Sequence, residues 1–266
     1  MLAVVIPARN EAARLELVIR QGLRLGAGLV IPVLNGCDDM SGEIIRRVGD
    51  KRVRPLTFKE PLGYDVPRIA GARLALELGA LGVIFVDADL GGPIFGALLA
   101  LADQLRHGEQ DLALCDCYAG TPVPFRKSAA ADVYQARLRL NRMLKRSDLG
   151  PAIPSHGPTG VSRRLLEQVP EASIGVPPLM QAHAIRTGLS AGIAAHIPHS
   201  ELGSVKRGRE HGINIAETII GDCLEAICLV EGRPSDRAGH IGYHHQRRFD
   251  TLSLVPPAQS GHTVSV

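Results

Sequence analysis

The chain of 266 residues has no tryptophan, and aromatic residues make up only 3% of it. Proteins that bind single-stranded nucleic acid stack bases on aromatic side chains, so this composition argues against that class. The net charge of +3 and the pI near 8.7 are too mild to indicate a nucleic-acid partner. No stretch of about 18 apolar residues is free of charge, which predicts that the chain has no membrane span.

The cysteines are few and follow no metal-binding spacing. Because no CxxC pair exists, a zinc site is not indicated, and reduced core cysteines are the better interpretation. Their odd number and the lack of a recognisable signal peptide favour a cytoplasmic protein. The five are Cys37, Cys115, Cys117, Cys223 and Cys228.

Apolar segments with strand-like and helix-like spacing alternate from the first residue. The strands are expected at 2–6, 29–34, 52–58, 83–87, 111–118 and 191–197. The helices are expected at 11–25, around 44–48, and at 66–78, 93–105, 129–145, 179–188 and 213–230. This alternation predicts an α/β fold with a mostly parallel central sheet and helices on both faces. We expect a single domain over 1–232 with halves at 1–118 and 119–232, then a tail at 233–266 that is partly disordered.

The run Val83–Leu90 is an apolar strand that ends in two carboxylates, Asp87 and Asp89. A carboxylate is disfavoured inside a central parallel strand unless it is paired or binds a metal. Both are therefore expected at the carboxyl end of the strand, where open α/β sheets bind ligands. Two hard oxygen ligands there suit Mg²⁺ or Mn²⁺ bridging to a diphosphate. The alternative is a turn in which aspartate caps the next segment.

Two other predicted strands end in polar clusters on the same edge. They are Pro7–Glu11 after the first strand and Asn35–Asp39 after the second. One such loop would be ordinary helix capping, whereas three at one rim favour a binding cleft. The first turn contains no GxGxxG, which weighs against a dinucleotide site.

In their order and spacing these segments resemble the nucleotide-sugar glycosyltransferases of the GT-A fold, in particular those similar to glycosyltransferase family 2. The matching segments are Val4–Glu11, Asn35–Ser41, Val66–Arg73 and the DxD motif Asp87–Asp89. The resemblance implies a GT-A fold and a UDP- or GDP-sugar bound by the half at 1–118. It also implies an acceptor bound by 119–232, with Mg²⁺ or Mn²⁺ as cofactor.

The resemblance also implies roles for individual residues. Glu11 and Asn35 would contact the nucleobase and ribose, and Arg68 would approach the diphosphate. Asp89 would be a direct metal ligand, and Asp87 would lie near the ribose and the metal. The residues implied for the nucleotide sugar are Pro7, Ala8, Asn10, Glu11, Asn35, Asp39, Arg68, Asp87, Ala88 and Asp89, with Asp39 as readily a helix cap.

The segment Pro154–Arg164 is similar to the acceptor-binding loop of these enzymes, where a glycine-rich turn opens a helix whose amides hold an anion. The acceptor candidates are Ser155, Thr159 and Gly160. An ordinary loop that enters a helix is the alternative.

The segments Ile174–Leu179 and Glu201–Gly203 resemble the glucosyl-3-phosphoglycerate synthases, in which a following segment supplies a metal-binding histidine. His211 stands in that place, with His199 as the substitute and a plain surface histidine as the alternative. The nearby basic residues suit a phosphate, or form a solvated loop; they are Lys206, Arg207 and Arg209.

Two departures from the family pattern bear on catalysis. Inverting members carry an aspartate base near 175–181, where this chain has no carboxylate, and Glu171 is the nearest acid. The lack fits a retaining mechanism or a protein without catalysis. Ile69 also replaces an asparagine of the family.

Two alternative functions stay open. One is a nucleotidyltransferase, which the missing glycine-rich first loop disfavours, and the other is a non-catalytic nucleotide-sugar binder. The sequence allows a homodimer.

Overall fold

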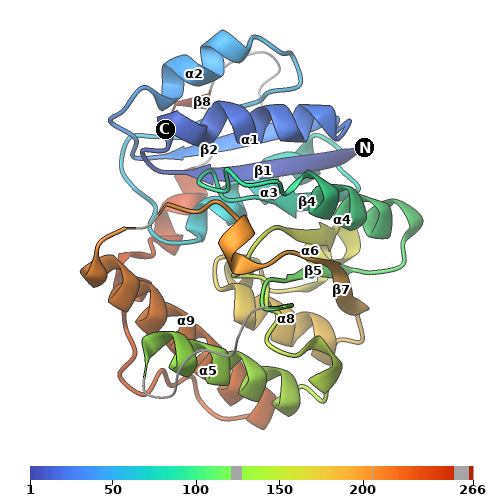
Figure 1. The fold of residues 1–266 in the computed structure, drawn as a ribbon, viewed down its shortest axis with the longest axis vertical. Coiled ribbons are helices and arrows are strands. Elements are labelled where there is room, and N and C mark those ends of the chain that lie inside the picture. The colour runs from blue at the N-terminus through green and yellow to red at the C-terminus, as the bar shows by residue number, and fades with distance from the viewer. Residues whose placement is uncertain (121–127, 206, 255–263, 266) are drawn as a thin grey trace.

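Eight strands form one mixed sheet in the computed structural model, which describes residues 1–120, 128–205, 207–254 and 264–265 (Figure 1). Every pairing is parallel except the two made by β6. The mostly parallel α/β sheet predicted from the sequence is confirmed. In order of pairing the strands are β7 (Ala191–His196), β5 (Leu112–Asp116), β6 (Thr159–Ser162), β4 (Gly82–Phe85), β1 (Leu2–Ala8), β2 (Leu29–Asn35), β3 (Leu56–Phe58) and β8 (Val264–Ser265).

Helices connect the strands and cover both faces of the sheet (Figure 1). The predicted helices are all found, with ends that shift by a few residues. The α-helices of the described chain are α1 (Ala12–Arg24), α2 (Ser41–Val48), α3 (Val66–Glu77), α4 (Phe95–His107), α5 (Ala129–Met143), α6 (Arg163–Gln168), α7 (Glu171–Ile174), α8 (Pro177–Arg186) and α9 (Arg209–Glu231).

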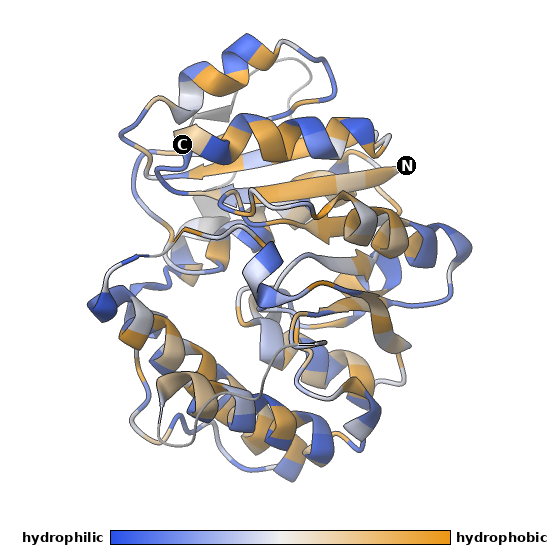
Figure 2. Ribbon diagram, viewed as in Figure 1, coloured by the Kyte–Doolittle hydropathy of each residue, from blue (hydrophilic) through white to orange (hydrophobic). Residues whose placement is uncertain are grey.

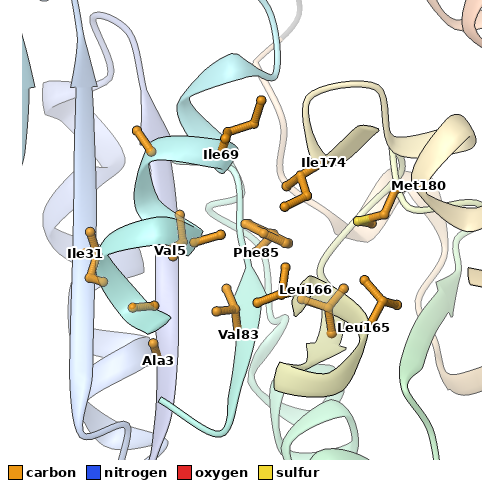
Figure 3. Packing of buried hydrophobic residues seen from close by; sticks show 14 of the residues in the cluster. Ala3, Val5, Ile31, Ile69, Val83, Phe85, Leu165, Leu166, Ile174 and Met180 are labelled. Carbon is orange, nitrogen blue, oxygen red and sulfur yellow. The ribbon is translucent and has the colours of Figure 1, made fainter. Parts of the chain in front are cut away.

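The side chains of β1 alternate between two hydrophobic cores, as the period of a strand requires. Ala3 and Val5 belong to the core under α3, α6, α7 and α8, part of which Figure 3 shows. Val4 and Ile6 belong to the core under α1, α2 and α4. All four are fully buried, so β1 is a central strand with no solvated face.

Gly71 allows α3 to lie close against β1. A Cβ at this position would overlap the side chain of Val5. The contact seats the start of α3, which opens with Val66-Pro67, beside the carboxyl end of β1. A proline at the first helical turn is tolerated because its missing N–H needs no partner there.

A third core lies between α5, α8 and α9, at the end of the molecule farthest from α1 and α2 (Figure 1). Figure 2 shows the alternation of hydrophobic and hydrophilic residues along these helices. Asn141 is buried here, donates to the carbonyls of Gly150 and Ala152, and accepts from Gln181. This network ties the loop before β6 to α5 and α8.

The expectation that a glycine-rich turn at 154–164 opens directly into a helix is wrong at Thr159–Ser162. These residues form β6, which inserts antiparallel between β4 and β5. The helix begins only at Arg163, with Ser162 as its N-cap. The strand expected at 52–58 is also shorter: it reduces to β3 and an isolated bridge from Val53 to Val30.

The first part of the predicted tail packs on the domain. Arg237 and Arg247 are buried, and both form ion pairs with Asp222 of α9. The amide of Arg248 donates to the carbonyl of Leu62 at 2.8 Å. This part of the tail thus packs against α9 and against the loop before α3, whereas residues 255–263 lie outside the described residues.

Candidate active site

The carboxyl ends of β1 and β4 border a cavity of about 800 Å³. The strand order changes direction between these neighbours, because β2 and β3 lie on one side of β1 and β4 on the other. Such a switch point is where open α/β sheets bind ligands. The lining includes Pro7, Ala8, Arg9, Asn10, Glu11, Arg14, Asn35, Tyr64, Asp65, Asp87, Ala88, Asp89, Arg207, His211 and Tyr243.

The DxD motif continues the pairing of β4 with β1 beyond the regular strand. The amide of Val86 donates to Val5 at 3.0 Å, and the amide of Ala88 donates to Pro7 at 3.2 Å. The chain then turns at Ala88–Asp89, where the amide of Leu90 donates to the carbonyl of Asp87 at 3.1 Å, and the side chains of Asp87 and Asp89 both line the cavity. The prediction that both carboxylates lie at the carboxyl end of a strand is confirmed.

Arg68 lies behind Asp87 and is only 3% exposed. Its Nη2 donates to Asp87 at 3.1 Å, its Nη1 donates to the carbonyl of Pro154 at 3.1 Å, and its Nε lies 3.1 Å from Asp65. Two hydrogen bonds and the ion pair with Asp65 hold the guanidinium, which does not line the cavity. In this conformation Arg68 holds Asp87 in place.

Asp89 is partly buried and lies near other carboxylates. Burial raises its pKa to about 6, and the neighbouring carboxylates of Asp87 and Glu11 add to the rise. A carboxylate whose pKa is raised in this way is stabilised when it binds a proton or a cation. The site thus has the electrostatic character of a cation site.

The turn after β1 is held by side chains from the turn after β2. Asn10, just before α1, has a left-handed backbone (φ 57°), and its side-chain oxygen accepts from the amide of Asp38 at 3.0 Å. The cap comes from Asp39, whose carboxylate accepts from the amides of Ala12 and Ser41, each at 2.9 Å. Although burial opposes it, these hydrogen bonds lower the pKa of Asp39. Asp39 therefore acts as a helix cap, and its contact with a nucleotide sugar stays a prediction.

Asn35 fixes the loop that precedes α3. Its Oδ1 accepts from the amide of Leu62 at 2.6 Å, and its Nδ2 donates to the carbonyl of Gly63 at 3.2 Å. The loop then presents Tyr64, whose ring stacks on Tyr243 at 5.9 Å, as one wall of the cavity. Sequence reasoning missed Tyr64 and Tyr243, because only the fold brings the two segments together.

Asp65 connects the DxD motif to the C-terminal segment. It has a left-handed backbone (φ 62°), contacts Arg68, and lies 3.6 Å from Arg247. Arg247 in turn donates twice to Asp222 at 2.7 Å and once to the carbonyl of Tyr64 at 3.1 Å. A buried chain of alternating charges therefore runs from α9 to Asp87.

Arg207 and Glu11 form an ion pair across the cavity. Burial raises the pKa of Glu11, and the guanidinium of Arg207 opposes the rise. Arg9 and Arg14 also line the cavity, so three cations surround it. Lys206 lies outside the described residues, and Arg209 begins α9 as an exposed residue.

His211 lines the cavity, and its Nδ1 lies 2.8 Å from the hydroxyl of Tyr243. The ligand atoms of Asp87, Asp89 and His211 do not all come within 4.8 Å of one another, although the three residues share one cavity. The substitute, His199, contacts His156 and is not part of the cavity lining.

Asp222, Glu225 and His244 do gather their ligand atoms within 4.8 Å, but this group is not a convincing metal centre. Arg237 donates to both carboxylates, and Arg247 donates to Asp222. Two guanidinium groups already neutralise the acids, so a cation there would be repelled.

The acceptor candidates do not lie open on the cavity. Thr159 is fully buried in β6 and donates to the carbonyl of Pro154 at 3.2 Å. Gly160 lies between Leu105 and Ala113, where a Cβ would press on both. The hydroxyl of Ser155 is buried and has no hydrogen-bond partner in the described chain. Their acceptor role stays a prediction.

The chain offers no base from α8 at the cavity. Pro177 and Pro178 are buried at the start of α8. Glu171 pairs with Arg73 of α3 at 2.9 Å and does not line the cavity.

No family model matches this chain, and no curated protein matches its sequence. Solved structures do match most of it. The glucosyl-3-phosphoglycerate synthase from Mycobacterium tuberculosis in complex with Mn²⁺, UDP-glucose and phosphoglyceric acid has a TM-score of 0.62 and 23% identity, over 88% of this chain and 80% of that one. The same synthase with Mn²⁺, UDP-glucose and glycerol 3-phosphate gives 0.61 and 21%, over 88% and 81%.

The chain has the fold of these synthases. A crystal structure described as a mycobacterial protein matches in the same way, with a TM-score of 0.60 and 19% identity, over 88% of this chain and 75% of that one. The GT-A fold implied by the sequence motifs is thereby confirmed. None of the described helices is long and apolar enough to cross a membrane.

Proposed function

We propose that this chain is a metal-dependent glycosyltransferase. It transfers a sugar from a UDP- or GDP-sugar to a small acceptor, and the acceptor itself can be phosphorylated. The observation that carries the proposal is the position of Asp87 and Asp89, which leave β4 together at the switch point of the sheet and line one cavity. The cavity volume, about 800 Å³, suits a molecule of the size of a nucleotide sugar.

The charges around the cavity support a diphosphate and a divalent cation side by side. Arg9, Arg14 and Arg207 provide cations for phosphate oxygens. Asp89 and Asp87 provide the hard oxygen ligands that Mg²⁺ and Mn²⁺ prefer, and His211 lines the same cavity. The raised pKa of Asp89 indicates that a bound cation would stabilise its ionised form.

The bound cation would offset the negative charge that develops on the departing diphosphate. The protein's own contribution is position. Arg68 holds Asp87 in place, and Asn35 holds the loop that carries Tyr64. Arg207 can exchange its contact with Glu11 for a phosphate oxygen, which places a cation where the leaving charge appears.

Structures of the same fold give independent support. The matching synthase from Mycobacterium tuberculosis was crystallised with Mn²⁺ and UDP-glucose, and also with phosphoglyceric acid or glycerol 3-phosphate. Those ligands name the first donor and acceptors to try on this chain.

A second candidate is a non-catalytic protein that binds a nucleotide sugar. It is favoured by the segment at Pro177, where no carboxylate is available to act as base, and by the engagement of Glu171 with Arg73. A nucleotidyltransferase is the weaker alternative, because the turn at Pro7–Glu11 has no glycine-rich loop for a triphosphate.

The test is a panel of UDP- and GDP-sugars incubated with the full chain, Mn²⁺ and small acceptors with and without phosphate. We expect release of UDP or GDP together with a glycosylated acceptor, and loss of both in Asp89→Ala. Tight donor binding without transfer or hydrolysis would favour the non-catalytic binder. Pyrophosphate release from a nucleoside triphosphate would favour the nucleotidyltransferase.

A further inference from the structure

Arg137 of α5 is a buried cation with no acidic partner among the described residues. It is only 2% exposed, and it forms no ion pair with any described residue. The residues outside the described ranges include no aspartate or glutamate. Burying an unpaired charge is costly, so proteins pair such a group or keep it for a ligand.

The hydrogen bonds around Arg137 all run outward from it. Its Nη1 donates to the hydroxyl of Tyr118 at 3.1 Å and to Nδ1 of His156 at 2.7 Å. Because a guanidinium has donors only, the Nδ1 of His156 must accept. Burial lowers the pKa of His156 well below its usual value, and Arg137 adds to this, so the ring is neutral and carries its proton on Nε2.

That proton determines the next contact in the chain. The Nε2 of His156 lies 2.9 Å from Nδ1 of His199, which must therefore accept. His199 is left with its own N–H on Nε2, and this residue is exposed. The cluster thus ends at the surface in a hydrogen-bond donor.

The cluster also has hydrogen-bond donors with no acceptor among the described residues. The Nε of Arg137 is buried and has no hydrogen-bond partner among the described residues. The hydroxyl of Tyr118 accepts from Arg137 and so keeps its own O–H to donate. The carboxylate at the end of β5, Asp116, accepts from the amide of Tyr118 at 2.9 Å and lies 3.5 Å from His196, but it forms no ion pair with Arg137. Surplus donors, a buried cation and no carboxylate are the composition of an oxyanion site.

The cluster is attached to the candidate active site through the loop before β6. His156 lies two residues after Pro154, whose carbonyl accepts from Arg68, the residue that holds Asp87. The rings of Tyr118 and His156 lie 5.2 Å apart, and those of His156 and His199 lie 5.1 Å apart. Packing of Tyr118, from the end of the half at 1–118, against two histidines of the half at 119–232 therefore holds the donors in place.

We propose that Arg137, Tyr118, His156 and His199 form a binding site for an oxyanion, either a free phosphate or a phosphate or carboxylate group on the acceptor. The acceptor source rests on the proposed function; the anion site itself does not. An anion there supplies the missing counter-charge of Arg137 and accepts from the outward donors of Tyr118 and His199.

The direct test is a thermal titration of the full chain with inorganic phosphate, without nucleotide or metal. Phosphate should raise the melting temperature of the wild type in a saturable way. His199→Ala should need at least about tenfold more phosphate, because a lost charge-assisted hydrogen bond is worth roughly 1.5–3 kcal/mol. His196→Ala, an exposed histidine at the end of β7, is the matched control. Arg207→Ala shows whether phosphate binds in the cavity instead.

The proposal is overturned if phosphate does not stabilise the wild type, or if His199→Ala responds like His196→Ala. Because Arg137→Lys alters a buried group and can fail to fold, the imidazole NMR signals of wild-type His156 and His199 give a second readout. Both should shift with phosphate, and unshifted signals would also overturn the site.

A transfer assay separates the two sources of the anion. If the site holds the acceptor, His199→Ala raises the KM for glycerol 3-phosphate and leaves the KM for glycerol and the affinity for UDP unchanged. If His199→Ala weakens the response to phosphate in the thermal titration but leaves the KM for glycerol 3-phosphate unchanged, the site binds free phosphate. If no transfer occurs at all, the proposed function fails while the phosphate titration still decides the site.

Discussion

Arg68 donates to Asp87 across 3.1 Å from a position behind the cavity, with its guanidinium almost completely buried. The first carboxylate of the DxD motif is therefore held by a residue that a ligand does not reach in this conformation. The same guanidinium contacts Asp65, so one cation serves two acids. Its removal should act on stability as well as on the site.

We expect Arg68→Met to destabilise the protein by about 3–5 kcal/mol, because it leaves Asp87 without its cation and the buried Asp65 with only its longer contact to Arg247. Arg73→Ala, on the same helix, breaks a half-exposed pair with Glu171 and should cost less than about 1 kcal/mol. Urea unfolding of both variants measures the difference. Equal effects of the two substitutions would contradict the buried charge chain.

Arg247 should matter for ligand binding although it comes from the C-terminal segment. It holds the carbonyl of Tyr64, a residue of the cavity wall. Arg247→Met should weaken UDP binding by about tenfold, the value of one hydrogen bond of roughly 1–1.5 kcal/mol. Arg248→Ala, an exposed neighbour, should not. Calorimetric titration under conditions where both variants are folded provides the comparison, and unchanged UDP affinity in Arg247→Met would count against this wall.

The raised pKa of Asp89 gives metal binding a defined pH dependence. Since a cation must displace the proton, Mn²⁺ affinity should rise with pH up to about 6 and level off above it. Asp89→Asn should remove this dependence and weaken Mn²⁺ by at least about 100-fold, because even outer-shell partners are worth roughly 10- to 100-fold. Mn²⁺ titrations from pH 5 to pH 8 test this. A flat profile in the wild type would contradict it.

The same pKa makes a statement about metal-free stability. The folded state binds the proton of Asp89 more tightly than the unfolded state does, so this group's contribution to stability falls as pH rises from about 3.8 to about 6. Without metal, Asp89→Asn should therefore melt above the wild type at pH 7, and the gap should narrow at pH 4. Asp38→Asn, an exposed neighbour outside the cavity, is the control, and an equal shift there would remove the assignment to Asp89.

Arg207 is expected to bind the diphosphate. Arg207→Ala should weaken UDP by about tenfold or more, since charge-assisted hydrogen bonds are worth roughly 1.5–3 kcal/mol. Arg209→Ala, two residues later and outside the cavity lining, should have little effect. A titration in which both variants lose affinity equally would indicate general attraction by a basic segment.

The sequence was informative where residues act locally. Periodicity and strand-end chemistry predicted the parallel strands and placed Asp87 and Asp89 at one edge, because a parallel sheet collects its carboxyl ends together. β6 was missed because its four residues, Thr159–Ser162, lie among glycines and prolines and have no distinctive period. Its strand character comes from pairing with β4 and β5.

Contacts between distant segments could not be predicted. Arg68 was expected to face the diphosphate, and only the fold shows Asp65 and Asp87 around it. Arg247 lies in a stretch whose composition predicts disorder, yet it is buried because it forms an ion pair with Asp222 of α9. Asp39 illustrates the same limit, since the helix end it caps belongs to a different turn.

The central claim is that the cavity binds a nucleoside diphosphate together with a divalent cation held by the DxD motif. Calorimetric titration of UDP and of GDP, with and without Mn²⁺, into the wild type and Asp89→Asn tests it most directly. We predict that one of the two nucleotides binds at least about tenfold more tightly with Mn²⁺, a gain of roughly 1.4 kcal/mol, and that Asp89→Asn abolishes this gain. Binding of neither nucleotide, or an equal Mn²⁺ gain in Asp89→Asn, would contradict it.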